Sequence, residues 1–338
     1  MSKTLLLFCG GTISMHKNDQ TKALDISHSY DQLLELEPRF SQICDVDIEF
    51  IDNIDSTNLT SLQWTKIADT IGRNYDRYDG FVITMGTNTM AYCSAALSFA
   101  LPNIGKPVVL TGAQIPAESL STDARNNFIN ALKLSTLNAS GVFVVFGSKI
   151  IRGCRAKKVS ESELDAFRTF NQKDFGEIGV GTIFNFKQPR HNEPLNVQSK
   201  FVEQIVCLTL IPGLQADVLK CLIDSGTRGF ILRAYGSGDI PYNFEESLLY
   251  AKKKGIPVVI TTQCPGGATV MGMNDVGLKA LQTGVIQAFD MCMEAMSTKL
   301  MWLLGQNTPY EKIKELMETN FVGEVDSSRA AAIMGIEE

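Results

Sequence analysis

The stretch Thr4-Leu5-Leu6-Leu7-Phe8-Cys9-Gly10-Gly11-Thr12-Ile13 joins a short apolar run to a glycine turn and a hydroxyl. The apolar run predicts a buried strand, and the two glycines let the backbone turn sharply and approach another group closely. Thr12 then stands at the carboxyl end of this strand, where open α/β sheets bind ligands. Its hydroxyl is a candidate nucleophile. The alternative, on this stretch alone, is an ordinary turn whose threonine caps a helix.

Further short apolar runs alternate with longer segments of helical period along the chain. The expected strands are 46–51, 80–84, 107–110 and 141–146, and the expected helices are 61–75, 89–101 and 123–137. Strands that alternate with helices of this length predict βαβ units and a parallel sheet. The strands are apolar throughout, which is typical of a sheet covered by helices on both faces.

Residues 186–202 interrupt this alternation with two prolines, asparagines and mixed charges, and we interpret them as a linker. We therefore expect a larger catalytic domain over 1–185, layered as α/β/α, and a smaller α/β domain over 203–338. In the second domain, the expected strands are 204–210, 228–232 and 257–261, and the expected helices are 214–224, 244–254, 274–283, 292–305 and 309–320.

Composition excludes several classes of protein. The net charge of −6 over 338 residues favours neither a nucleic-acid partner nor a membrane surface. No apolar run approaches the ~20 residues of a membrane span. The eight cysteines are scattered without a C-x-x-C pair. These features predict a protein of the reducing cytoplasm.

Two other segments repeat the pattern of a strand followed by small hydroxyl residues. Gly86-Thr87-Asn88-Thr89 follows the strand at 80–84, and Asp55-Ser56-Thr57-Asn58 follows the strand at 46–51. Neighbouring parallel strands would bring Thr12 and Thr87 to one crevice. For the first segment, capping of the next helix by Asn88 or Thr89 is the alternative. For the second, the alternatives are a carboxylate-binding loop and a simple turn.

A threonine nucleophile needs a base, and a partly desolvated lysine can take its proton. The segment Arg152-Gly153-Cys154-Arg155-Ala156-Lys157-Lys158 offers two lysines. Spacing does not say which of them would act, and a solvated surface cluster is the alternative.

Taken in order, these motifs resemble those of the bacterial L-asparaginase family, and most closely its cytoplasmic type I branch. The matching segments are G-G-T-I at 10–13, G-T-x-T-M-A-Y at 86–92, V-x-T-G-x-Q-I-P at 109–116, R-G-x-R-x-x-K at 152–158 and D-A-F at 165–167. The resemblance continues through Pro212-Gly213, Ile231-Leu232-Arg233, Thr262-Gln263-Cys264 and Asp290 to Lys299, and so covers nearly the whole chain.

The resemblance implies hydrolysis of asparagine to aspartate and ammonia without a metal or organic cofactor. It implies that Thr12 forms an acyl-enzyme and that Thr87 and Lys158 form a second hydroxyl–amine pair. The other roles that it implies are substrate binding by Asp55, Ser56, Thr57, Thr87 and Asn88, acceptance of the leaving amide by the carbonyl of Ala113, a mobile lid over 13–28, and an asparagine effector site at Arg233, Tyr235, Thr262 and Cys264. It also implies a homodimer or a dimer of dimers whose sites are completed across the interface.

Three positions depart from the family pattern. Asn88 stands where the family has an aspartate, and Asp239 stands where it has an asparagine, in the segment Tyr235-Gly236-Ser237-Gly238-Asp239. We hypothesise a reciprocal exchange that keeps one carboxylate in a composite site; two unrelated changes are the alternative. Lys22 falls where the family has a lid tyrosine, and Tyr30 could replace that tyrosine only if the loop runs differently.

Other functions stay open at this point. Loss of the charge at position 88 favours an amidase for an N-blocked or peptide substrate, and a non-catalytic amino-acid sensor is a third possibility. The presence of Thr12, Thr87 and Lys158 together argues against the sensor. A tRNA-dependent amidotransferase subunit would need a partner chain and a basic surface. Nucleotide binding is disfavoured, because the chain has neither G-x-G-x-x-G after its first strand nor a P-loop.

Overall fold

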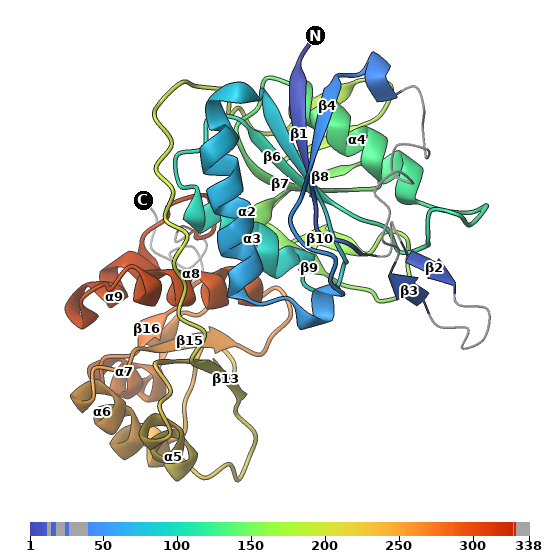
Figure 1. The fold of residues 1–338 in the computed structure, drawn as a ribbon. Coiled ribbons are helices and arrows are strands. Elements are labelled where there is room, and N and C mark those ends of the chain that lie inside the picture. The colour runs from blue at the N-terminus through green and yellow to red at the C-terminus, as the bar shows by residue number, and fades with distance from the viewer. Residues whose placement is uncertain (12–14, 18–23, 27–39, 327, 329–338) are drawn as a thin grey trace. The chain divides into compact units, whose positions relative to one another are not determined.

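The computed structural model describes residues 1–11, 15–17, 24–26, 40–326 and 328 of the chain. The chain divides into two compact units, Met1–Ser199 and Lys200–Glu338, each with its own sheet (Figure 1). The segment 186–202 crosses this division, and its role as a linker stays a prediction.

The first unit is built on an eight-stranded mixed sheet. Its strands are β1 (Lys3–Phe8), β4 (Asp45–Phe50), β5 (Gly80–Thr84), β6 (Pro107–Thr111), β7 (Gly141–Phe146), β8 (Lys149–Arg152), β11 (Gly176–Ile178) and β12 (Thr182–Phe184), in the order β12-β11-β8-β7-β6-β5-β1-β4. The strands from β4 to β7 are parallel, as predicted. At the other edge, β8, β11 and β12 extend this parallel core as antiparallel strands, which the sequence pattern did not predict. Short strands with mixed polarity gave no period from which they could be predicted.

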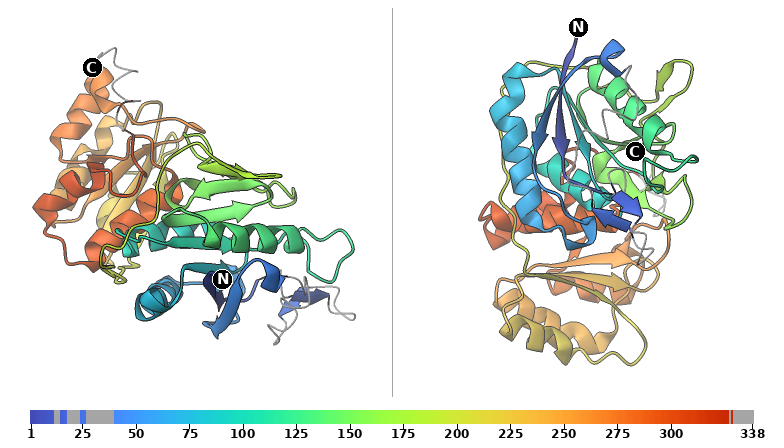
Figure 2. Two further views of the ribbon diagram at one scale, coloured as in Figure 1. Left: turned by 90° about the horizontal axis from the view of Figure 1, so that it is seen from above. Right: turned by 45° about the vertical axis from the view of Figure 1, so that its right-hand side comes forward.

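Helices cover both faces of this sheet, as Figure 2 shows from two further sides. On one face, α4 (Ala124–Thr136) packs Phe128 and Leu132 into a core with Leu6, Val82 and Val109 of the strands. On the other face lie α2 (Ser61–Asn74) and α3 (Met90–Ala100). Because α3 is made almost entirely of small and apolar residues, it is buried on nearly every side.

Shorter elements complete the first unit. They are β2 (Met15–Lys17) paired with β3 (Leu24–Ile26), β9 (Ala156–Lys158) paired with β10 (Phe167–Thr169), and the 3₁₀ turns η2 (Phe40–Gln42), η3 (Ser56–Asn58), η4 (Tyr75–Arg77) and η5 (Gly153–Arg155).

The second unit has a four-stranded parallel sheet in the order β13-β14-β15-β16. Its elements are β13 (Ile205–Thr209), α5 (Asp217–Asp224), β14 (Gly229–Ala234), η6 (Tyr242–Phe244), α6 (Glu245–Lys253), β15 (Val258–Thr262), η7 (Met271–Met273), α7 (Asp275–Gln282), β16 (Ile286–Gln287), α8 (Met293–Gly305) and α9 (Tyr310–Glu318). The predicted helices and three strands of this unit are confirmed, and β16 was missed because it is only two residues long.

A core cluster between the sheet and helices α5, α6 and α7 holds this second unit together. Leu219, Leu248 and Ala280 from the three helices meet Phe230 and Leu232 of β14. Within the described part of the chain, no helix is long and apolar enough to cross a membrane.

Candidate active site

The register of the parallel strands brings four loops to one edge of the first sheet. Phe8 at the end of β1 lies opposite Phe50 of β4 and Thr84 of β5, and Thr84 lies opposite Thr111 of β6. The four strands therefore end at the same level. Each is followed by one of the segments that the sequence singled out.

The end of β1 lies against the loop after β5 because two glycines leave room for it. Gly11 has a φ of +99°, and a Cβ added to it would lie 2.4 Å from the backbone nitrogen of Gly86. A Cβ on Gly86 would in turn lie 2.5 Å from Oγ of Ser56. No residue other than glycine fits either position without moving the backbone. Thr12, Lys22 and the expected lid at 13–28 lie outside the described residues, apart from the backbone of β2 and β3.

Lys158 is the lysine that reaches this edge. It ends β9, and its Nζ donates to Oγ1 of Thr87 at 2.7 Å and to Oδ1 of Asn88 at 3.1 Å. Lys158 is half-buried, and desolvation lowers its pKa below the usual lysine value, while Glu161 acts in the opposite sense. The hydroxyl and the amide that accept from its ammonium are neutral groups, so neither holds the proton by charge.

The Thr87 hydroxyl lies between Lys158 and a glutamine that sequence reasoning missed. Thr87 Oγ1 donates to Oε1 of Gln114 at 3.1 Å, and Nε2 of Gln114 donates to the backbone oxygens of Glu161 and Glu163, each at 3.1 Å. Gln114 belongs to the V-x-T-G-x-Q-I-P motif, so its position was visible in the sequence but its contact was not.

A second missed residue, Asp123, supports Gln114 from behind. Its carboxylate accepts hydrogen bonds from the backbone N–H groups of Gln114 and Ile115 and from the Asn127 side chain. It stands before α4 but makes no side-chain capping bond there. Between Thr111 and this turn lies Ala113, whose methyl group is buried in the sheet core.

The loop after β4 meets the loop after β5 through side chains. Asn88 donates from Nδ2 to Oγ1 of Thr57 at 3.0 Å, and Thr89 donates to the backbone oxygen of Ser56 at 2.8 Å. Asp55 accepts from the backbone N–H of Thr57 at 2.8 Å. Thr89 stands at the N-cap position of α3 but makes no side-chain capping bond, and the Asn88 side chain bonds to Lys158 and Thr57 instead. The alternative that one of these side chains caps the helix is therefore not borne out.

The effector residues expected in the second unit lie at or just beyond the ends of β14 and β15. Thr262, at the end of β15, donates to the backbone oxygen of Gly236 at 2.6 Å and accepts from the N–H of Cys264 at 3.0 Å. Tyr235 and Asp239 close a turn after β14 with two backbone bonds. Arg233 points toward Oγ1 of Thr209 at 3.4 Å.

Two polar atoms in that turn are buried without a hydrogen-bond partner among the described residues. They are Oδ1 of Asp239 and the hydroxyl of Tyr235. Buried polar groups are nearly always paired, so this turn is an incomplete polar site as it stands.

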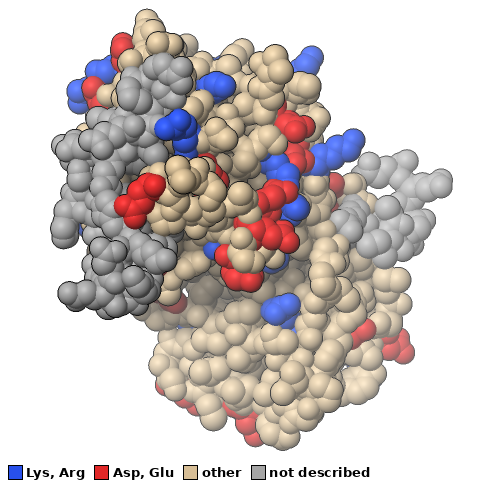
Figure 3. Space-filling model, turned by 90° about the vertical axis from the view of Figure 1, so that its right-hand side faces the viewer, with Lys and Arg blue, Asp and Glu red and all other residues tan. Residues whose placement is uncertain are grey.

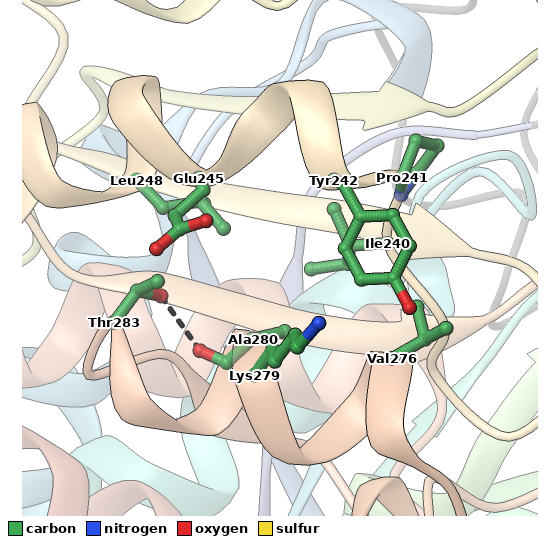
Figure 4. Close-up of a pocket in the computed structure, with 9 residues that line it drawn as sticks. All are labelled: Ile240, Pro241, Tyr242, Glu245, Leu248, Val276, Lys279, Ala280 and Thr283. Carbon is green, nitrogen blue, oxygen red and sulfur yellow. Dashed lines mark hydrogen bonds between the residues drawn. The ribbon is translucent and has the colours of Figure 1, made fainter.

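A recess between α6 and α7 is a different feature (Figure 4). Lys279 lies over the Tyr242 ring at 4.5 Å, and Glu245 lines the same recess. Its volume of about 10 Å³ has room for about one water molecule. None of the predicted site residues lines it. In the described residues, no group of three or more His, Cys, Asp or Glu side chains is arranged to hold a metal ion.

Two family models match the chain, one in each unit. "Asparaginase, N-terminal" matches residues 3–191, and "Glutaminase/Asparaginase C-terminal domain" matches residues 204–317. The fold and the matches define an amidohydrolase acting on C–N bonds. The chain belongs to the asparaginase family.

Curated relatives extend over almost the whole chain. It is 36% identical to an L-asparaginase of Thermococcus kodakarensis, over 96% of this chain and 100% of that protein, and 37% identical to L-asparaginase 1 of Escherichia coli K12, over 94% and 96%. It is also 31% identical to a glutamyl-tRNA(Gln) amidotransferase subunit of Pyrococcus abyssi, over 96% of this chain and 77% of that protein.

Solved structures agree with the sequence relatives. The thermostable L-asparaginase of Thermococcus kodakarensis matches with a TM-score of 0.86 over 96% of this chain and 99% of that one, at 36% identity. A probable cytoplasmic L-asparaginase from Campylobacter jejuni matches with a TM-score of 0.82 at 26% identity, over 95% of this chain and 100% of that one.

Proposed function

We propose that this protein hydrolyses L-asparagine to L-aspartate and ammonia through an acyl-enzyme on Thr12, without a metal or organic cofactor. The observation that carries the proposal is the 2.7 Å contact between Nζ of Lys158 and Oγ1 of Thr87. Thr87 follows Gly86, and the backbone of Gly86 lies against Gly11, the residue before Thr12. L-Asparaginase activity is the activity named for the Thermococcus and Escherichia relatives, which match over 100% and 96% of their length.

In the proposed first step, Thr12 Oγ1 attacks the side-chain amide carbon, and its proton passes to the amide nitrogen. The C–N bond breaks, ammonia leaves with an added proton, and an ester to Thr12 remains. In the second step, water attacks the ester carbon and gives a proton to the Thr87–Lys158 pair. The ester C–O bond then breaks, the pair returns the proton to Thr12 Oγ1, and aspartate leaves. Desolvation favours the neutral amine of Lys158, which is the form that can accept a proton.

Substrate positioning is proposed for the loop after β4. Ser56 would hold the substrate carboxylate, with Asp55 and Thr57 beside it, and the carbonyl of Ala113 would accept from the leaving amide. The support is that Thr57 is tied to Asn88 at 3.0 Å and that Ser56 lies against the Gly86 backbone.

The missing charge at Asn88 leads to a proposal about a second copy of the chain. We propose that Asp239 of that copy supplies the carboxylate in a homodimer or a dimer of dimers. Asp239 supports this role because it stands in the turn after β14 and is only partly buried in the single chain. A double-mutant cycle on Asn88→Asp and Asp239→Asn tests it: coupled effects on kcat/KM support the exchange, and additive effects refute it.

The decisive experiment measures ammonia release from L-asparagine by the Lys158→Met variant. Removal of a general base is expected to lower kcat by about 10²–10⁴-fold. Lys157→Met is the matched control, because the neighbouring lysine lies over the Phe170 ring at 5.6 Å and is expected to leave kcat unchanged. Equal activity of the two variants would refute the proposal.

Three other functions are distinguished by their substrate, their partner or the absence of a product. The neutral Asn88 favours an amidase for N-blocked or peptide substrates, and N-acetyl-asparagine cleaved faster than free asparagine would establish it. The Pyrococcus relative named as a glutamyl-tRNA(Gln) amidotransferase subunit suggests an ammonia donor to a partner. On the side seen in Figure 3, Lys and Arg lie among Asp and Glu rather than in one basic patch. An amino-acid sensor would bind asparagine and release no ammonia.

An effector site at Arg233, Tyr235, Thr262 and Cys264 is proposed as well. Thr262→Val removes the hydroxyl that bridges Gly236 and Cys264, whereas Thr262→Ser keeps it. Sigmoidal kinetics that are lost in the valine variant and kept in the serine variant would support the site. Hyperbolic kinetics of the unmodified protein would refute it.

A cytoplasmic location stays a prediction, in keeping with the name of the Campylobacter structure.

A further inference from the structure

The two long edge strands of the two sheets are built differently. β4, at one edge of the eight-stranded sheet, carries Asp45, Asp47 and Glu49 among its six residues. β13, at one edge of the four-stranded sheet, reads Ile205-Val206-Cys207-Leu208-Thr209 and has no charge. Charged side chains on an edge strand prevent pairing with another chain. β4 has this protection and β13 lacks it.

The free edge of β13 is exposed as well as uncharged. Among the described strands, β14 is its one ladder partner. Cys207 and Thr209 are exposed, and Ile211 just beyond the strand is 60% exposed. Seen from the side in Figure 3, the lower part of the surface, which belongs to the second unit, is largely uncharged.

The backbone polarity of this edge can be read from the bonds on its other side. Gln204 accepts from Arg228, and Leu210 donates to the oxygen of Arg233, so the even-numbered residues direct their polar groups toward β14. Because this direction alternates along a strand, Cys207 and Thr209 direct their N–H and C=O groups outward. Such a row of outward groups is a template for one more strand.

We infer that β13 of one molecule pairs antiparallel with β13 of a second copy about a two-fold axis through Cys207, so that the two four-stranded sheets become continuous. A second copy fits because the strand is self-complementary in this register. Val206 lies opposite Leu208 of the copy, and both side chains belong to the face packed toward α5 and α6. Cys207 lies opposite its own equivalent. The inference does not depend on the proposed function, since no group of the candidate active site takes part.

The geometry makes Cys207 a reporter of this pairing. Directly opposed residues in a hydrogen-bonded antiparallel pair have Cα atoms about 5.5 Å apart, which is within the range that a disulfide spans. Oxidation of the unmodified protein with copper–phenanthroline is expected to give a covalent dimer joined at Cys207. Cys207→Ser should abolish the dimer, and Cys221→Ser, at another exposed cysteine, should not.

Charge substitutions test the same pairing without oxidation. Cys207→Glu and Cys207→Lys each place like charges directly opposite one another, which destabilises a strand pair. Each variant is expected to halve the mass measured by analytical ultracentrifugation, and a mixture of the two is expected to restore it as a heterodimer. Cys221→Glu, on α5, is the matched control and should leave the mass unchanged.

Three results would overturn the inference. The first is an oligomer that oxidation does not link through Cys207. This result is obtained with the unmodified protein, so it does not depend on whether a variant folds. The second is an unchanged mass for both charged variants. The third is a monomer whose 205–209 amides are protected from hydrogen exchange, because that would assign this edge to another occupant.

Discussion

Replacement of Asn88 by aspartate tests how a charge at position 88 affects the protonation of Lys158. The Asn88 Oδ1 atom lies 3.1 Å from Nζ of Lys158, so the substitution places a carboxylate oxygen beside the amine with little change in shape. Two unit charges at that distance attract by about 1 kcal/mol in water-like surroundings and about 5 kcal/mol at an effective dielectric constant of ~20. Because Asn88 is exposed and Lys158 is only half-buried, solvent screening keeps the effect near the lower figure.

That energy has a defined effect on the protonation of Lys158, the proposed base. An adjacent anion favours the ammonium form, and about 1.4 kcal/mol corresponds to a tenfold change in the ratio of the two forms. In the unmodified protein, desolvation lowers the pKa of Lys158, so the neutral form becomes populated at a lower pH than for an ordinary lysine. Asn88→Asp should move the acidic limb of kcat upward by about one pH unit and reduce kcat below that limb about tenfold.

The assay is the pH profile of ammonia release at saturating asparagine, with kcat and KM determined separately. The new carboxylate can also attract the substrate ammonium, so KM is expected to fall while kcat falls. Thr57→Val is the control, because it removes the Asn88–Thr57 bond without adding charge, and its limb should not move. A profile of Asn88→Asp that coincides with that of the unmodified protein, or moves to lower pH, would refute the role of Lys158 as the base.

Two further predictions concern the framework. Gly11→Ala should reduce stability and ammonia release together, by several kcal/mol in the free energy of unfolding, because its Cβ would lie 2.4 Å from the Gly86 nitrogen at a φ of +99°. Gly147 also has a positive φ but has open space around it, so Gly147→Ala should reduce the free energy of unfolding, measured with urea, by much less. Lys299→Met should lower the free energy of unfolding by about 3–5 kcal/mol, because it leaves the fully buried Glu324 carboxylate without the ammonium that pairs with it at 2.6 Å. Adding Glu324→Gln should recover part of that loss, and no recovery would contradict the ion-pair explanation.

Much of the fold follows from the alternation of apolar runs with helical periods. The parallel strands β1 and β4 to β7 were predictable because each is a continuous apolar or half-apolar run bounded by turn residues. The strands between Lys149 and Phe184 were not, since they are three or four residues long and carry mixed polarity. Their pairing depends on contacts with an existing sheet edge, which a local pattern does not contain.

The candidate site divides in a similar way. The strand-end segments with Thr87 and Ser56 were visible because glycine and small hydroxyl residues mark the end of a parallel strand. The choice of Lys158 over Lys157 depends on the direction of one side chain at the end of β9, and periodicity does not specify it. The contacts of Gln114 and Asp123 join residues 27 and 9 positions apart, respectively. Their partners can be identified only once the sheet is formed.

The bonds of Gln114 limit how the proposed base can work. Its Nε2 must face the carbonyls of Glu161 and Glu163, because these oxygens can only accept. Its Oε1 therefore faces Thr87. The Thr87 hydroxyl donates its one proton to Gln114, so it can only accept a hydrogen bond from Lys158. This arrangement suits a protonated lysine. For a neutral Lys158 to take a proton through Thr87, the hydroxyl must turn from Gln114 toward Nζ. The loop carrying Glu161 and Glu163 would therefore act on the proposed base through the glutamine that it holds.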